Sequence, residues 1–238
     1  MLLSSVILVL REVLEAALLF SLLMALSVQL GISLRWVLVA VIAGMLGAAI
    51  FGFNIDRISE LYDGMGQELL NAALQLGIFV LLSGIGVVAI LRVRRFSIAP
   101  QLLPVLMAAC VILAVTREGS EIMIYLSGFL QVSDQWVAVL TGSFIGAGIG
   151  ISGGTVFYFS MLTLKPRFAA VIGALLLALV AAGMTLQATE LLIQADWLPA
   201  DYPLWDTSAM LSEQSVIGQL LYALIGYEAT PTALQLSA

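Results

Sequence analysis

The chain has 238 residues, of which 62% are hydrophobic and only 10% are charged, and its formal net charge is −6 at pH 7. Soluble domains average about 45–50% apolar and about 25% charged residues. So much apolar surface cannot be hidden in one water-soluble core. The composition therefore excludes an ordinary soluble domain and indicates an all-α integral membrane protein surrounded by lipid. No nucleic-acid partner is expected.

A membrane-spanning helix needs about 20 predominantly apolar residues. Six segments meet this need, and a weaker seventh lies at about 213–238, where Pro231 interrupts the pattern. The first segment lacks the basic start and the cleavage site of a signal peptide, so we interpret it as a true helix. The six predicted spans are residues 4–29, 34–54, 67–91, 100–131, 134–163 and 167–193.

Lysine and arginine concentrate in alternate connections, which predicts that those connections are cytoplasmic. The amino terminus is then outside and the carboxyl terminus inside. The outer connections, 55–66 and 194–212, are acidic, and the second carries aromatic residues typical of the headgroup region. Two interpretations stay open: interfacial segments with solvated charges, or an acidic vestibule that concentrates cations. The basic residues of the predicted cytoplasmic connections are Arg35, Arg92, Arg94, Arg95, Lys165 and Arg167.

Four glycines recur at a four-residue spacing in the fifth predicted span. Small residues at this spacing let two helices approach closely in lipid. We interpret this face as a packing surface without a role in substrate binding. Its members are Gly142, Gly146, Gly150 and Gly154.

Two predicted spans carry charges near their middles, at 11–15 (Arg-Glu-Val-Leu-Glu) and 117–121 (Arg-Glu-Gly-Ser-Glu). Each charge at mid-helix costs about 2.5–3.5 kcal/mol on insertion scales unless it pairs, hydrates or binds an ion. At about 100° per residue, the arginine and both glutamates of each Arg-Glu-x-x-Glu motif share one sector of the helix. The two glutamates lie about 4.5 Å apart along the axis, so both can reach one ion.

The four motif glutamates outnumber the two arginines, which leaves two negative charges if all are ionised. Each arginine can hold one carboxylate of its own motif, and the remaining oxygens invite a di- or trivalent cation. The chain has no histidine and a single cysteine, so any metal site must use oxygen ligands. Salt bridges that lock the bundle are the alternative, and two copies with surplus carboxylates make that alternative weaker.

The two motifs also indicate an internal duplication. One motif-bearing helix begins each group of three spans, at about 1–95 and 96–195. An odd number of spans per unit predicts opposite orientations in the membrane, which is the inverted repeat of many transporters. The predicted architecture is thus seven transmembrane helices, a 3+3 inverted repeat plus a C-terminal helix, within a single domain at 1–238.

With these motifs in the first and fourth of seven spans, the chain resembles the oxidase-dependent iron transporter family, which includes fungal high-affinity iron permeases and bacterial EfeU-type permeases. The resemblance extends over nearly the whole chain, including Asp63-Gly64 with Glu68, the stretch from Thr189 to Gln194, and the stretch from Gly218 to Tyr227. It implies that Glu12, Glu15, Glu118 and Glu121 are iron ligands positioned by Arg11 and Arg117. Secondary candidates along the metal path are Glu68, Glu190, Asp63 and Ser120.

The expected function is therefore high-affinity import of iron, with ferric iron favoured, by a multi-pass bacterial inner-membrane permease that is not an enzyme. Iron is the transported substrate, no cofactor is permanently bound, and the resemblance implies an extracytoplasmic iron-oxidising or iron-delivering partner. The oligomeric state stays open. The alternatives are transport of ferrous iron or another hard divalent cation, an intramembrane carboxylate enzyme, or a structural membrane subunit. Arginine beside each glutamate pair keeps carboxylates ionised, which counts against the enzyme.

Overall fold

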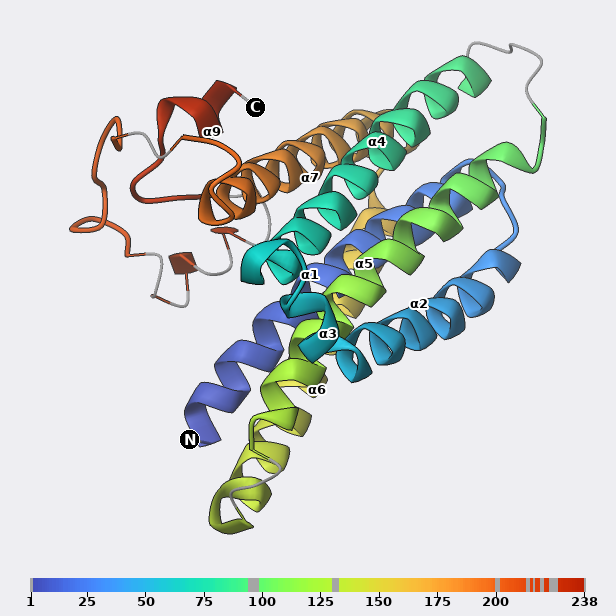
Figure 1. Cartoon of the computed structure of the whole chain (residues 1–238). Coiled ribbons are helices and arrows are strands. Elements are labelled where there is room, and N and C mark those ends of the chain that lie inside the picture. The colour runs from blue at the N-terminus through green and yellow to red at the C-terminus, as the bar shows by residue number, and fades with distance from the viewer. Residues whose placement is uncertain are drawn as a thin grey trace.

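The structure is a computed structural model that describes residues 2–93, 99–129, 133–199, 202–212, 215, 217–218, 221–222 and 227–237. Six long helices dominate this part of the chain (Figure 1). This part also has three shorter helical segments, helical residues at 217–218 and 221–222, and an isolated β-bridge between Pro203 and Thr232. The long helices are α1 (Leu2–Gln29), α2 (Arg35–Phe53), α4 (Gly66–Val93), α5 (Leu102–Ser127), α6 (Ser133–Thr163) and α7 (Pro166–Gln194), and the short ones are α3 (Ile55–Ser59), η1 (Tyr62–Gly64) and α9 (Ala233–Ser237).

Each of the six predicted spans coincides with one long helix. Within the described residues, five helices are long and apolar enough to cross a membrane, namely α2, α4, α5, α6 and α7. Helix α1 has 28 residues and carries the charges of the first motif. The predicted end of the fourth span, Gln131, lies outside the described residues, and helix α5 ends at Ser127.

Two helix boundaries follow directly from residue chemistry. Gly31 ends α1 with a φ of +66°, a backbone conformation that glycine adopts without strain. The Ile32 N–H then donates to the Ser27 carbonyl at 2.8 Å, which satisfies one of the last carbonyls of the helix. Pro166 begins α7, where its missing N–H and fixed φ are favourable.

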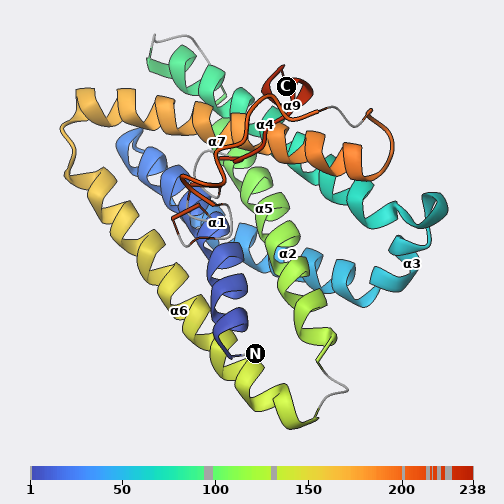
Figure 2. The ribbon, with the colours of Figure 1, turned by 90° about the vertical axis from the view of Figure 1, so that its left-hand side faces the viewer.

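The long helices pack in three main pairs, and within the α1–α6 and α2–α5 pairs the two helices run in the same direction. Helix α1 packs along α6, α2 along α5, and α4 along α7, and α5 also contacts both α1 and α4. Figure 1 shows α4 and α7 side by side, and Figure 2 shows α1 beside α6. Helix α5 therefore lies at the centre of the bundle, against α1 on one side and α2 and α4 on others.

The glycine face of α6 packs against α1, which confirms the predicted packing role and supplies the partner that the spacing alone does not specify. A Cβ atom added to Gly146 would lie 2.5 Å from the Val6 carbonyl oxygen, and one on Gly154 would lie 2.7 Å from the Ala17 Cβ. The Ser21 hydroxyl donates to the Gly154 carbonyl at 2.8 Å. These contacts require glycine because the two backbones approach too closely for any side chain.

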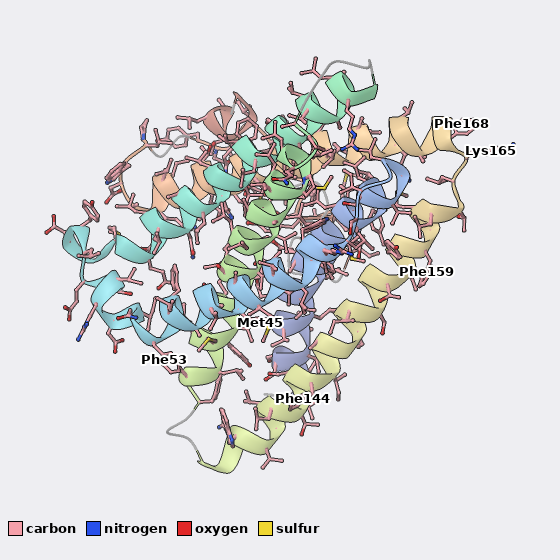
Figure 3. The ribbon with its side chains drawn as sticks, turned by 90° about the vertical axis from the view of Figure 1, so that its right-hand side faces the viewer. Met45, Phe53, Phe144, Phe159, Lys165 and Phe168 are labelled. Carbon is pink, nitrogen blue, oxygen red and sulfur yellow. The ribbon has the colours of Figure 1, made fainter. Side chains whose placement is uncertain are left out.

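The outer surface of the bundle is apolar, as expected of a protein in contact with lipid. Figure 3 shows Met45, Phe53, Phe144, Phe159 and Phe168 pointing away from the bundle, and all five are exposed. A soluble protein rarely exposes so much contiguous apolar surface. The buried core lies between α1, α4, α5 and α7, where residues such as Leu23, Ile78 and Met107 are fully enclosed.

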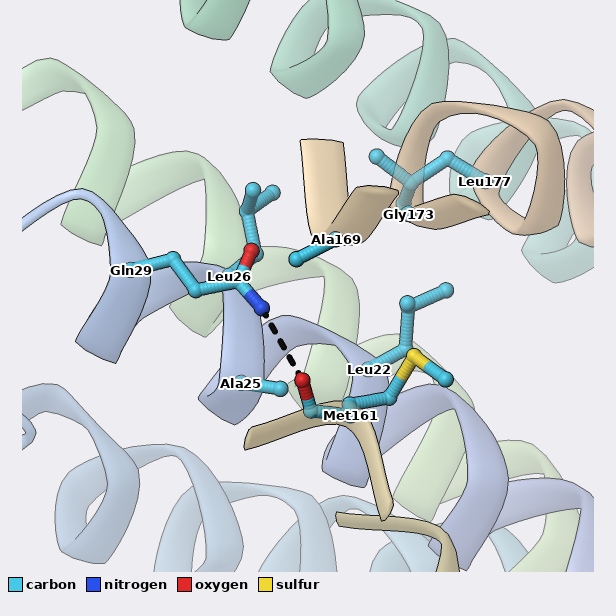
Figure 4. Close-up of a pocket in the computed structure, with 8 residues that line it drawn as sticks. All are labelled: Leu22, Ala25, Leu26, Gln29, Met161, Ala169, Gly173 and Leu177. Carbon is cyan, nitrogen blue, oxygen red and sulfur yellow. Dashed lines mark hydrogen bonds between the residues drawn. The ribbon is translucent and has the colours of Figure 1, made fainter. Parts of the chain in front are cut away.

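A small recess lies where the end of α1 meets α6 and α7 (Figure 4). Gln29 is its most polar side chain, and its Nε2 donates to the Met161 carbonyl at 3.4 Å. None of the eight lining residues is a carboxylate, so the recess offers little to a metal ion. It does show that the end of α1 and the α6–α7 connection lie at the same end of the bundle.

The two long acidic connections meet each other. The ring of Tyr62, in η1, lies edge-on to the ring of Trp197, with 6.3 Å between centroids. Tyr62, Asp63 and Asp196 all have positive φ, which is uncommon for residues other than glycine. In the second of these connections, hydrogen bonds from Ser208 to the Asp206 carboxylate hold the pKa of Asp206 below its ordinary value.

The predicted seventh helix at about 213–238 falls largely outside the described residues, since 213–214, 216, 219–220, 223–226 and 238 are not described. Residues 217–218 and 221–222 are helical, but 227–232 are not. The predicted helix therefore does not extend unbroken to 238, and the non-helical residues include Pro231, where the sequence pattern is interrupted. The N–H groups of Leu204 and Thr207 bond to the carbonyls of Pro231 and Ala229, both at 2.9 Å, so this stretch folds back on the acidic connection. Helix α9 has five residues, far too few to span.

Candidate metal centre

Helices α1 and α5 bring the two motifs to the same level. At one end of this pair the hydroxyls of Ser5 and Tyr125 are 2.6 Å apart, and at the other the Ser27 hydroxyl lies 3.1 Å from the Met107 sulfur. The start of α1 therefore faces the end of α5. In such an antiparallel register, the motif at 11–15 lies opposite the motif at 117–121.

Four of the six motif side chains are almost fully buried, namely Glu12, Glu15, Arg117 and Glu118. The other two are partly accessible: the Arg11 side chain is 34% exposed and that of Glu121 is 27% exposed. Buried charges require partners, because leaving water costs several kcal/mol per ion, roughly. The ion pairs of this cluster supply them.

Arg117 is the hub of the cluster. Its Nη1 lies 2.5 Å from Glu118 Oε1 and 3.2 Å from Glu15 Oε2, and its Nη2 lies 3.2 Å from Glu121 Oε1. Each arginine pairs with a carboxylate of its own motif, as expected, and Arg117 also reaches across to Glu15 of the first motif. Its planar fork allows this, because it presents several donors in fixed directions.

Glu15 lies between the two arginines. One of its oxygens is 3.2 Å from Arg11 Nε, and the other is 3.2 Å from Arg117 Nη1. Arg11 Nε also lies 3.9 Å from Glu12 Oε1. Both oxygens of Glu15 are therefore engaged by guanidinium groups. This residue connects the motifs more directly than the sequence pattern alone indicates.

The other three glutamates form a carboxylate triad. Glu12, Glu118 and Glu121 each offer one oxygen, and these oxygens lie within 4.8 Å of one another. The Oε2 atoms of Glu12 and Glu118 are buried without a hydrogen-bond partner. Oxygens on opposite sides of an ion with bonds of about 2.0–2.6 Å are roughly 4–5 Å apart, so this spacing suits a hard cation with little movement.

The secondary candidates do not join the triad. The Ser120 hydroxyl donates to the Arg117 carbonyl at 2.7 Å, so it supports its own helix. Asp63 is exposed in η1. Glu68, in the first turn of α4, has one buried oxygen without a hydrogen-bond partner, and Glu190, on α7, accepts a bond from Gln194 at 3.1 Å.

Sequence reasoning missed three polar contacts near the motifs or between the repeats. The Arg11 guanidinium lies over the ring of Tyr222, 4.5 Å from its centroid. Gln75 on α4 donates to Gln187 on α7 at 2.7 Å in a fully buried pair. The Ser5–Tyr125 bond is the third. The two glutamines were detectable as uncharged polar residues inside apolar spans, which are costly in lipid without a partner.

Comparison with protein families identifies the family to which this carboxylate-rich helical bundle belongs. The sequence profile of the iron permease FTR1 family matches residues 2–238, nearly the whole chain. The chain belongs to the iron permease FTR1 family. Comparisons with curated proteins and with solved structures gave no match.

Family membership confirms the resemblance noted from the motifs. The protein is a multi-pass membrane permease, and iron is its transported substrate. Membership in a permease family is also consistent with a transporter rather than an enzyme.

Proposed function

We propose that this permease imports iron, with ferric iron favoured, by binding it at the triad of Glu12, Glu118 and Glu121. The observation that carries the proposal is the spacing of these carboxylate oxygens, all within 4.8 Å of one another between two helices, with Glu12 and Glu118 buried and Glu121 partly accessible. Carboxylate oxygens are hard ligands, which ferric iron prefers over the sulfur ligands typical of copper(I).

In this proposal, Arg117 and the transported ion compete for the same carboxylates. Its guanidinium pairs with Glu118 and Glu121, two members of the triad. With all six groups ionised, the motifs carry two net negative charges, which a di- or trivalent cation neutralises or reverses. A cation bound to the triad therefore weakens the ion pairs of Arg117 with Glu118 and Glu121, while the ion pair with Glu15 keeps the guanidinium close to the site. Binding and release of iron are thus coupled to a small movement of one buried side chain.

The helix pairing supports an inverted repeat with units at about 1–95 and 96–195. In such a repeat, α1, α2 and α4 correspond in order to α5, α6 and α7. A two-fold relation then turns the α1–α6 contact into the α5–α2 contact and leaves the α4–α7 and α1–α5 contacts unchanged. The three largest contacts of the bundle, α1–α6, α2–α5 and α4–α7, obey this relation. The site lies between the two units, as it does in other inverted-repeat transporters.

We place the amino terminus outside and the carboxyl terminus inside a bacterial inner membrane. The basic residues Arg35 and Lys165 follow α1 and α6, whose ends meet at the recess of Figure 4, which supports a common cytoplasmic end. The acidic connections then form an outer vestibule in which Asp63, Glu68 and Glu190 attract cations. Ser120 acts indirectly, through the helix of the second motif. An extracytoplasmic iron-oxidising or iron-delivering protein docks on this outer face.

The test is radio-iron uptake in iron-starved cells that lack their own high-affinity importer. Wild type is compared with Glu12→Gln and Glu121→Gln at matched membrane abundance, and Glu60→Gln, in the exposed outer connection, is the matched control. Iron is supplied as ferric citrate and as ascorbate-reduced iron. We expect uptake of ferric iron by wild type and the control, and loss of at least tenfold in both triad variants, in line with about 1.4 kcal/mol or more of lost binding.

Two outcomes would contradict the proposal. Full uptake by both triad variants would return the motifs to a structural role. Uptake that is equal or higher with reduced iron, or that is blocked by excess manganese, would instead favour a carrier of ferrous iron or of hard divalent cations in general.

A further inference from the structure

The two motif arginines are held in different ways. Arg117 is enclosed by three carboxylates and by the helices around it. Arg11 contacts Glu15 closely and Glu12 more distantly, and a third of its side chain is exposed. One face of its guanidinium is covered by the ring of Tyr222, at 4.5 Å from the centroid. This aromatic contact is the support that Arg11 has in place of further carboxylates.

Tyr222 comes from a different part of the chain than the motif helices. It belongs to the C-terminal segment, which crosses over α1 and α7 in Figure 2. Tyr222 is partly buried, and it lies within electrostatic range of Glu190 and Glu15 as well as of Arg11. The C-terminal segment thus contributes a residue to the otherwise open side of the motif cluster.

Cation–π attraction acts on the guanidinium through the face of the ring, and it strengthens when the pair is removed from water. It leaves the edges of the guanidinium free, so Arg11 can point Nε at Glu15 while its face rests on the ring. Planar stacking of this kind suits arginine better than lysine. A ring at this place therefore restricts Arg11 to the orientation that pairs with Glu15.

We propose that Tyr222 is a positioning residue of the permease, which holds Arg11 on Glu15 and so sets the affinity of the carboxylate triad for iron. The inference rests on the proposed triad function. If Arg11 leaves Glu15, one oxygen of that carboxylate loses its partner, and Arg117 is drawn from Glu118 and Glu121 toward Glu15. The triad then loses its arrangement even though none of its own residues has changed.

The experiment measures equilibrium binding of radioactive ferric iron to the purified full-length permease in detergent. Tyr222→Leu and Tyr222→Met remove the ring, and Tyr222→Phe keeps it. Tyr158→Leu is the matched control, since that ring packs edge-on against Phe159 on α6. We expect a five- to tenfold weaker affinity for the two variants without a ring, and an affinity within twofold of wild type for Tyr222→Phe and the control.

A second arm tests whether Tyr222 acts through Arg11. In an Arg11→Gln background, Tyr222→Leu should change the affinity by less than twofold, because the interaction that it removes is already absent. An equal loss in both backgrounds, or a loss in Tyr222→Phe as large as in Tyr222→Leu, would overturn the inference. Glu121→Gln separates the two proposals: if it binds iron like wild type, the triad itself is wrong, whatever Tyr222 does.

Discussion

Glu15 and Glu121 belong to equivalent motif positions, yet the structure predicts different consequences for their replacement by glutamine. The side chain of Glu15 is 2% exposed and pairs with both arginines at 3.2 Å. Glu121 is 27% exposed and has one ion pair, to Arg117 at 3.2 Å. We expect both Glu15→Gln and Glu121→Gln to abolish uptake, and only Glu15→Gln to cost substantial stability.

The magnitudes follow from burial. Removing one partner of a buried ion pair costs about 3–5 kcal/mol. Arg117 keeps Glu118 and Glu121, and a glutamine oxygen still accepts one hydrogen bond worth about 1 kcal/mol, so we expect about 2–3 kcal/mol for Glu15→Gln. Glu121 is the accessible partner of its pair, Arg117 keeps Glu15 and Glu118, and a glutamine oxygen can still accept from the guanidinium, so we expect at most about 1 kcal/mol for Glu121→Gln.

Thermal unfolding of the purified variants, followed by fluorescence-detected size exclusion, measures the difference. In a protein of this size, 2–3 kcal/mol corresponds to a midpoint lower by about 4–12 °C. Uptake is measured in parallel at matched membrane abundance. Equal thermal loss in both variants, or a Glu15→Gln protein as stable as wild type, would refute the role of Glu15 as the anchor between the arginines.

Three further predictions concern single contacts. Arg11→Lys should lower uptake at limiting iron at least fivefold without lowering membrane abundance, because lysine lacks the planar fork, and wild-type uptake would mean that only charge matters. Gly146→Val should reduce assembly of folded permease in the membrane, since its Cβ would meet the Val6 carbonyl, and normal yield would refute the close packing of α1 and α6. Gln75→Leu should destabilise by about 1–3 kcal/mol through the unpaired amide of Gln187, and adding Gln187→Leu should recover most of that loss; an additive loss in the thermal midpoint would contradict the pairing.

The long helices were predictable because apolar runs of spanning length leave few alternatives in lipid. The motif faces were also predictable, since helical periodicity alone sets Glu12 and Glu15 on one sector. The glycine face of α6 was correctly assigned to packing, although its partner, α1, was not evident from the spacing.

What the sequence could not reveal depends on contacts between distant helices. The link from Arg117 to Glu15 needs the register of α1 against α5, which no local pattern specifies. For the same reason, the division of four equivalent glutamates into a triad and an anchor was not foreseen. The contact of Tyr222 with Arg11 depends on how the C-terminal segment folds back, which the interruption at Pro231 does not specify.

The most direct test of the central claim is a structure of the permease loaded with ferric iron, with anomalous diffraction data collected at the iron absorption edge. The account predicts an iron peak bound by carboxylate oxygens of Glu12, Glu118 and Glu121, with the Arg117 guanidinium withdrawn toward Glu15. A strong iron peak elsewhere, such as at Glu68 or at Glu190, with the triad still paired to Arg117, would contradict it.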